Sequence, residues 1–126
     1  MERTADVPAL VPMLRVASVT RSIAFYEQLG FSLRNVEGEA EPWWANVCAS
    51  GGAGAAELML SKVSAPHEPG STVLYYYVKD VRALHARLSA AGIAVTTIES
   101  REYASAGEFE VSDPDGHRLL VGQPDC

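Results

Sequence analysis

The sequence predicts an α+β fold in which two βαβββ repeats form curved mixed sheets around a cavity, with the helices outside. Three observations support this prediction. A strand pattern at residues 73–78 runs directly into a capped helix pattern that ends at Gly92. The same succession occurs earlier in the chain at a constant offset of 62 positions. Further strand patterns follow the helix in each copy, separated by turns rich in Gly, Pro and Asp.

The second copy of the repeat has the more regular pattern. Residues 73–78 are β-branched, aromatic or Leu, without Gly, Pro or charge, which is typical of a strand buried on both faces. Asp80 follows as a helix N-cap, and Gly92 supplies the left-handed residue that ends the helix. Between them, the helical period places three apolar side chains on one face, namely Val81, Leu84 and Leu88.

The first copy has the same elements in the same order. Residues 9–16 form a strand pattern, and Ser18 or Thr20 is placed to cap the following helix. Ile23, Tyr26 and Leu29 form the apolar stripe of that helix. The positions that match at the offset of 62 are Val16 with Val78, Val19 with Val81, Gly30 with Gly92, and Phe31 with Ile93. This constant spacing indicates an internal repeat.

The remaining strand patterns complete each half. They lie at residues 31–36, 43–49 and 55–63 in the first half, and at 93–98, 108–112 and 117–122 in the second. Residues 65–70, with two prolines and a glycine, are typical of a linker. At this length we predict a single domain over residues 1–126, with modules at about 9–63 and 71–123.

The composition is that of a globular domain, with 48% hydrophobic and 21% charged residues. A formal net charge of -6 disfavours nucleic acid and anionic lipid as partners. The first residues are charged where a signal peptide would be apolar, and no apolar run reaches membrane-spanning length, so we predict a cytoplasmic location and no membrane partner. Cys48 and Cys126 form no CxxC motif, and both are expected to be reduced thiols, with Cys48 buried.

One face of each predicted sheet is covered by its helix, so the other face is expected to line the cavity. Alternation along residues 73–78 turns Val73, Tyr75 and Tyr77 away from the helix. On the other strands, the residues predicted to face inward are Val11, Met13 and Arg15, then Glu57, Met59 and Ser61, then Glu108 and Glu110, and finally Arg118 and Leu120.

The chain resembles the vicinal oxygen chelate superfamily, which includes glyoxalase I, extradiol dioxygenases, fosfomycin resistance enzymes and bleomycin-binding resistance proteins. The resemblance covers nearly the whole chain. It rests on Met13-Leu14-Arg15-Val16, on Ser22-Ile23-Ala24-Phe25-Tyr26 with Leu29-Gly30-Phe31, and on Asp113-Pro114-Asp115-Gly116-His117. Family members complete the cavity by pairing modules within or between chains, and the resemblance therefore implies a homodimer as the expected assembly.

The metal positions of the superfamily are altered in this chain. Its enzymes usually hold a divalent metal with one His, Gln or Glu from each of the first, fourth, fifth and eighth strands, and these positions correspond to Val11, Glu57, Val73 and Leu120. Because only Glu57 carries a suitable donor, we predict no metal and no other cofactor. The chain is then most similar to the bleomycin-binding proteins, which sequester a drug between paired subunits without changing it and stack fifth-strand aromatic side chains on it.

These considerations predict a ligand site with aromatic and acidic walls, suited to a planar or cationic small molecule. The predicted ligand-binding residues are Met13, Arg15, Trp44, Glu57, Met59, Tyr75, Tyr77, Glu110 and Arg118. Trp43 and Trp44 point to opposite faces, and we favour Trp44 for the cavity. Arg15 either contacts a ligand carboxylate, as in the glyoxalase-like relatives, or pairs with Glu57 or Glu110.

Three functions fit the sequence. The leading one is a metal-independent binding protein of the glyoxalase/bleomycin resistance type that confers antibiotic resistance by sequestration. The alternative is a metal-independent lyase or isomerase with Glu57 as general base, its pKa raised by apolar neighbours. The third is a metalloenzyme with Glu57 and Glu110 as ligands. The histidines at 67, 85 and 117 form no ligand cluster and are expected at the surface or in turns.

Overall fold

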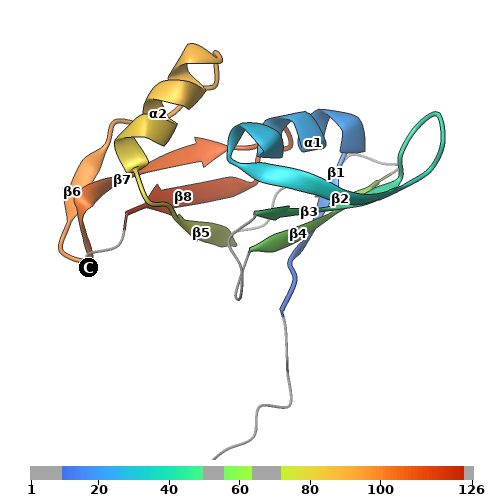
Figure 1. The fold of residues 1–126 in the computed structure, drawn as a ribbon, viewed down its shortest axis with the longest axis horizontal. Coiled ribbons are helices and arrows are strands. Elements are labelled where there is room, and N and C mark those ends of the chain that lie inside the picture. Colours follow the sequence, from blue (N-terminus) through green and yellow to red (C-terminus); the bar gives the residue numbers. More distant parts are fainter. Residues whose placement is uncertain (1–9, 50–55, 64–71, 124–126) are drawn as a thin grey trace, which may run out of the picture.

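The computed structural model describes residues 10–49, 56–63 and 72–123. These residues form two four-stranded sheets, and Figure 1 shows both helices on the same side of the sheets. In chain order the elements are β1 (Met13–Val16), α1 (Val19–Gln28), β2 (Phe31–Glu37), β3 (Trp44–Ala49), β4 (Glu57–Lys62), β5 (Val73–Tyr77), α2 (Val81–Ala90), β6 (Glu99–Arg101), β7 (Ala104–Ser112) and β8 (Arg118–Gly122).

The two modules share one topology. The first sheet has the strand order β1-β4-β3-β2 and the second has the order β5-β8-β7-β6. In each sheet the first two strands of this order are parallel, and the others pair antiparallel. The predicted α+β fold of two βαβββ repeats with mixed sheets and outer helices is therefore confirmed. Both sheets remain open and do not close into barrels.

The helix boundaries follow the predicted caps. The Ser18 hydroxyl accepts a hydrogen bond from the Arg21 amide at 3.2 Å, and Asp80 accepts one from the Ala83 amide at 3.0 Å. Ser18, and not Thr20, is thus the first N-cap. Gly30 and Gly92 have φ values of +102° and +81°, which glycine adopts without strain. The repeat in the sequence therefore corresponds to two matching helices, each with the same start and stop.

The core lies between each helix and its sheet. Tyr26, Leu88 and Phe109 are among the large side chains that are fully buried there. The alternation predicted for the strands is observed, since Leu58 and Leu60 in β4 and Leu119 and Val121 in β8 are buried on the helix side. The opposite faces carry the side chains predicted to face inward.

The strand predicted at residues 93–98 is wrong. This segment makes only an isolated bridge between Val95 and Val111, and the strand itself is β6, which starts at Glu99. At Thr96 the side chain replaces a carbonyl of the ladder, because its hydroxyl accepts the Glu110 N–H at 2.8 Å while its own N–H donates to the Glu110 carbonyl at 3.0 Å. The segment therefore runs beside β7 without forming a regular ladder.

Two other strand boundaries differ from the prediction. β1 begins at Met13, and the described residues 10–12 before it lie outside the strand, where Pro12 has no N–H to give to a ladder. Residue 9, where the predicted strand begins, lies outside the described residues. β7 begins at Ala104 and is longer than the predicted 108–112, because its first residues pair with β6 across a tight turn.

Asp113 joins the two modules through a buried network. One carboxylate oxygen accepts the amide hydrogens of Asp115 at 2.9 Å and His117 at 2.8 Å, which fixes the turn before β8. The other oxygen accepts the Tyr26 hydroxyl of α1 at 2.8 Å. The His117 ring also lies 2.8 Å from the carbonyl of Arg15, so the first and last strands are held together at this corner.

We expect Tyr26→Phe to lower the free energy of unfolding by about 1.5–3 kcal/mol, since it leaves a buried carboxylate oxygen without its donor. Tyr76→Phe is the matched control, because the Tyr76 hydroxyl is buried without a hydrogen-bond partner among the described residues and its removal should cost about 0–0.5 kcal/mol. Urea unfolding of both variants measures the difference. Equal losses would show that the Tyr26–Asp113 bond contributes nothing specific.

Candidate ligand-binding site

The open face of the second sheet gathers aromatic and charged side chains from four strands. Tyr75 pairs in register with Leu120, which pairs with Glu110, while Tyr77 pairs with Gly122, which pairs with Glu108. Since side chains at paired positions share a face, these residues lie in two adjacent rows across the sheet.

Glu108 is the centre of this arrangement. Glu108 is only 6% exposed, and both of its carboxylate oxygens accept hydrogen bonds. Tyr75 donates to Oε2 at 2.8 Å, whereas Tyr103 and Arg101 donate to Oε1 at 2.9 Å and 3.2 Å. Arg101 also contacts Glu99 at 2.7 Å. The buried charge is therefore compensated by one cation and two hydroxyls.

These contacts set the ionisation of the cluster. Burial acts to raise the pKa of Glu108, but the hydrogen bonds from Tyr75, Tyr103 and Arg101 outweigh it and hold the pKa below its usual value. Burial, together with the hydrogen bond to Glu108, raises the pKa of Tyr75. Glu108 is thus an ionised anchor with neutral tyrosines around it. Its saturated carboxylate is poorly placed to act as a general base.

Three tyrosine rings form what we call the tyrosine platform, consisting of Tyr75, Tyr77 and Tyr103. The ring centroids of Tyr75 lie 5.0 Å from those of Tyr77 and 6.4 Å from those of Tyr103. Tyr77 is 68% exposed and Tyr103 is 61% exposed. Glu108 fixes the hydroxyls of Tyr75 and Tyr103, so these two rings are held in place before any ligand arrives, and the Tyr77 ring packs against Tyr75.

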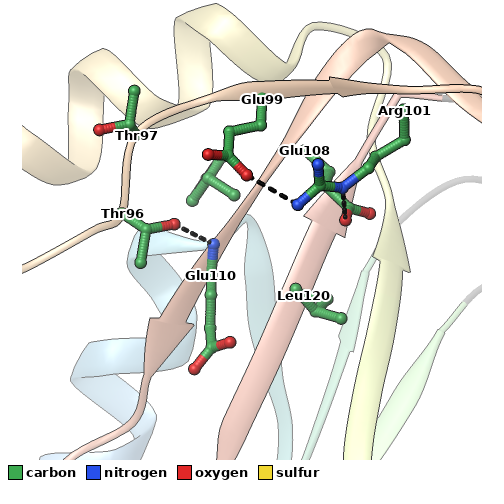
Figure 2. A pocket seen from close by; sticks show the side chains of 8 residues that line it. Thr96, Thr97, Glu99, Arg101, Glu108, Glu110 and Leu120 are labelled. Carbon is green, nitrogen blue, oxygen red and sulfur yellow. Dashed lines mark hydrogen bonds and ion pairs between the residues drawn. The ribbon is translucent and has the colours of Figure 1, made fainter.

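A pocket of about 380 Å³ lies beside the platform, on the same sheet. Figure 2 shows Glu108, Glu110 and Leu120 at its floor and Arg101 reaching between Glu99 and Glu108. Its lining residues are Thr96, Thr97, Glu99, Arg101, Glu108, Phe109, Glu110 and Leu120. This size is at the lower end of the range for small-molecule sites.

Glu110 and Arg118 form a bidentate ion pair on the same face. The Arg118 Nε lies 3.0 Å from one carboxylate oxygen, and an Nη lies 2.8 Å from the other. The hydrogen bonds from Arg118 lower the pKa of Glu110. Both side chains lie on the open face, as the strand alternation predicts, but they neutralise each other.

The open face of the first sheet carries the other predicted site residues. Met13 and Met59 are paired in register, as are Arg15 and Ser61, and Trp44 pairs with Ser61. Trp44 is half-buried on this face, Met13 is 56% exposed, and Trp43 precedes the strand and is exposed. The nine predicted site residues therefore divide between two open faces, with five on the first sheet and four on the second.

Glu57 has two polar partners. Its carboxylate accepts a hydrogen bond from the Asn46 amide at 2.6 Å and lies 3.8 Å from Arg34. These partners were not expected from the apolar residues that flank Glu57 in the sequence. Of the two roles considered for Arg15, the ion pair with Glu57 or Glu110 is not found among the described residues.

The positions used by the metal enzymes of the superfamily do not fit a metal in this chain. Val11, Val73 and Leu120 have no donor atoms, which leaves Glu57 alone. In the part of the chain that the structure describes, no three His, Cys, Asp or Glu side chains are grouped for metal binding, and the proposed pair of Glu57 and Glu110 lies on separate sheets.

The cysteines and histidines form no grouped site among the described residues. Cys48, expected to be buried, is half-buried and lies 3.8 Å from Arg34. His85, expected at the surface, is half-buried and approaches the Thr96 carbonyl at 2.9 Å. His67 and Cys126 lie outside the described residues.

The nine predicted site residues do not include Glu108, Arg101 and Tyr103, which organise the tyrosine platform. Glu108 was expected on the cavity face by alternation, but its burial gave no signal in the sequence. Arg101 is the last residue of β6 and Tyr103 lies in the β6–β7 turn, beside a shift of the pairing register between Glu99 and Arg101. An alternating pattern does not extend through such a shift, so these two partners were missed.

Solved structures of other proteins share the fold of this chain. The chain is similar to the solved structure of TnmS3, an antibiotic binding protein from Streptomyces sp. CB03234, with 25% identity, coverage of 97% of this chain and 100% of that one, and a TM-score of 0.73. A glyoxalase/bleomycin resistance protein from the same organism is 27% identical, with coverage of 90% and 97% and a TM-score of 0.71.

A bleomycin-binding protein solved with bleomycin shares the fold, at 20% identity, coverage of 94% and 100%, and a TM-score of 0.69. No curated protein sequence matches the chain. Among the described residues, neither helix is long and apolar enough to cross a membrane. The family model described as Glyoxalase/Bleomycin resistance protein/Dioxygenase superfamily matches residues 9–121, and the chain therefore belongs to that superfamily.

Proposed function

We propose that this chain is a metal-independent small-molecule binding protein that sequesters a planar, antibiotic-like compound. The observation that carries the proposal is the tyrosine platform next to a pocket, in which the buried carboxylate of Glu108 holds the Tyr75 and Tyr103 hydroxyls and Tyr77 packs against Tyr75. Preset aromatic faces favour flat ligands, since little conformational entropy is lost on binding. The similarity to an antibiotic binding protein supports the same function.

The contacts favour a planar ligand over a cationic one. Each acid expected to attract a cation already has a partner, because Glu108 is bound by Arg101, Glu110 by Arg118, and Glu57 by Asn46. A cation would have to displace these partners, at the cost of leaving an arginine or an amide unpaired. We therefore propose stacking on the rings, and not charge, as the main source of affinity.

We further propose that the protein acts as a homodimer in the cytoplasm. Each sheet leaves one face open, and the first face carries Met13, Met59 and half-buried Trp44 opposite no described element. In a two-fold symmetric dimer, the first open face of each copy would cover the second open face of the other, so both pairs of open faces would be closed. Sedimentation equilibrium should give twice the 13.5 kDa mass of one chain.

We expect Tyr77→Ala to weaken the binding of a planar aromatic ligand roughly tenfold, because it removes an exposed ring from the platform. Titration with bleomycin and with anthraquinone-type compounds, followed by quenching of Trp43 and Trp44 fluorescence, measures the affinity. Since Tyr77 is largely exposed, the substitution should leave the stability within about 0.5 kcal/mol.

Tyr77→Phe is the matched control, since it keeps the ring and should keep the affinity within about twofold of the wild type. The contradicting results are equally clear. If no compound in the panel binds the wild-type protein, or if Tyr77→Ala binds as tightly as Tyr77→Phe, the platform is not the ligand site.

A further inference from the structure

A second hollow lies on the helix side of the second module, away from the tyrosine platform. It has a volume of about 480 Å³, and we call it the outer pocket. Its lining residues are Arg82, His85, Ser89, Val95, Thr96, Thr97 and Ile98. α2 supplies one wall, and the segment that fails to become a strand supplies the other. The pocket thus exists because residues 93–98 do not pair regularly with β7.

The α2 wall presents a row of polar groups. Arg82, His85 and Ser89 are spaced by three and four residues, so they share one side of the helix, next to the buried stripe of Val81 and Leu84. Arg82 is exposed and has no ion pair or hydrogen bond with any described residue. Its guanidinium is therefore available to an anion without displacing an internal partner.

The opposite wall offers a different chemistry. Val95 and Ile98 are half-buried and pack against the core, and they give the pocket an apolar side. The His85 ring is fixed in the pocket lining, since Nε2 lies 2.9 Å from the Thr96 carbonyl and the ring packs edge-on against Phe109 at a centroid distance of 5.0 Å. A charged end and an apolar end thus face one another across a preformed space.

We propose that the outer pocket is a second small-molecule site, which binds a carboxylate or phosphate attached to a small apolar group. Arg82 and the Thr97 hydroxyl bind the anionic group, and Val95 and Ile98 contact the apolar part. This site is separate from the tyrosine platform, and its occupation does not require the proposed antibiotic-binding function.

Thr96 connects the two sites. It lines both the outer pocket and the pocket beside the platform, and its hydroxyl and amide are both bonded to the backbone of Glu110. Glu110 in turn holds Arg118 on the open face. A ligand that contacts Thr96 in the outer pocket is therefore expected to shift the Glu110 amide, which bonds the Thr96 hydroxyl.

Titration of the 15N-labelled protein with sodium benzoate and, separately, with inorganic phosphate tests the proposal. We expect saturable amide shifts at Arg82, His85 and Thr97, with benzoate binding several-fold more tightly than phosphate because it also fills the apolar side. Arg82→Gln should weaken benzoate binding by about tenfold or more. Lys79→Gln removes the same charge outside the pocket, and its affinity should match the wild type.

The outcomes separate clearly. Shifts that do not saturate, or an equal loss in Arg82→Gln and Lys79→Gln, would show only general charge attraction and overturn the proposal. Tighter binding of phosphate than of benzoate would overturn the role of the apolar wall.

Thr96→Val tests the coupling, since benzoate should still bind while the shift of the Glu110 amide is lost. Binding of planar ligands at the platform is measured separately, so failure of either site leaves the other interpretable.

Discussion

Glu108→Gln is expected to lower the free energy of unfolding by about 2–4 kcal/mol, the largest loss that we predict for any single site-face substitution. The carboxylate is buried and accepts three hydrogen bonds, whereas a glutamine amide presents one oxygen and a nitrogen that cannot accept. At least one tyrosine hydroxyl would lose its acceptor. Urea unfolding at pH 7 measures the loss, and the same variant should bind planar ligands more weakly because the platform is no longer fixed.

Glu110→Gln is the matched control for this result. Glu110 lies on the same strand and face as Glu108, but the side chains of Glu110 and its partner Arg118 on β8 are 30% and 50% exposed. Exposed pairs contribute about 0–1 kcal/mol, so this variant should stay close to the wild type. If both glutamine variants lose the same stability, burial of Glu108 does not have the consequence that we assign to it.

The pH dependence of stability should reflect the same cluster. Because folding holds the pKa of Glu108 below its usual value of 4.5, its ionised form stabilises the native state fully at neutral pH. This contribution is lost as the pH falls from about 5 through the lowered pKa. The stability difference between wild type and Glu108→Gln should therefore shrink on acidification. A difference that grows instead would mean that the folded pKa is raised.

The sequence predicted most of the fold because its strongest signals are local. Asp80 and Ser18 cap helices that start at matching positions, and alternation identified the buried face of β4 and β8. The failure at residues 93–98 has a specific cause. Val95 and Ile98 are typical strand residues, but the Thr96 hydroxyl accepts the Glu110 N–H where a backbone carbonyl would do so in a regular strand pair. Strand propensities do not predict this kind of side-chain hydrogen bond.

The sequence predicted which side chains share an open face, but not how their charges are paired. Alternation placed Tyr75, Tyr77 and Glu110 on one open face, as the pairing register has them. It gave no indication that Arg101 would reach Glu108 from the end of β6, where the pairing register is shifted. The acids therefore suggested a cation-binding cavity in the sequence, whereas the structure shows them paired internally. Side-chain pairing over several strands depends on tertiary geometry, which the strand pattern alone does not contain.

Gly122→Ala is expected to lower the free energy of unfolding by about 1.5–3 kcal/mol and to weaken binding of planar ligands. Tyr75 crosses the sheet directly over Gly122 to reach Glu108. A Cβ at position 122 would lie 2.2 Å from the Tyr75 hydroxyl oxygen and 3.0 Å from the ring carbon that bears it. The ring must move away, and Glu108 loses a donor. Thermal or urea unfolding and the fluorescence titration measure the two effects.

A double-variant cycle with Tyr75→Leu separates this mechanism from a general intolerance of alanine in β8. The backbone at Gly122 is not among those with positive φ, so alanine fits its conformation and should even gain a few tenths of a kcal/mol from the unfolded chain. Once Tyr75→Leu has removed the hydroxyl, Gly122→Ala should cost about 0–0.5 kcal/mol, which corresponds to a coupling of about 2 kcal/mol between the positions. Additive losses would instead place the strain elsewhere in the strand. They would also mean that the absence of a side chain at position 122 is not what allows Tyr75 to reach Glu108.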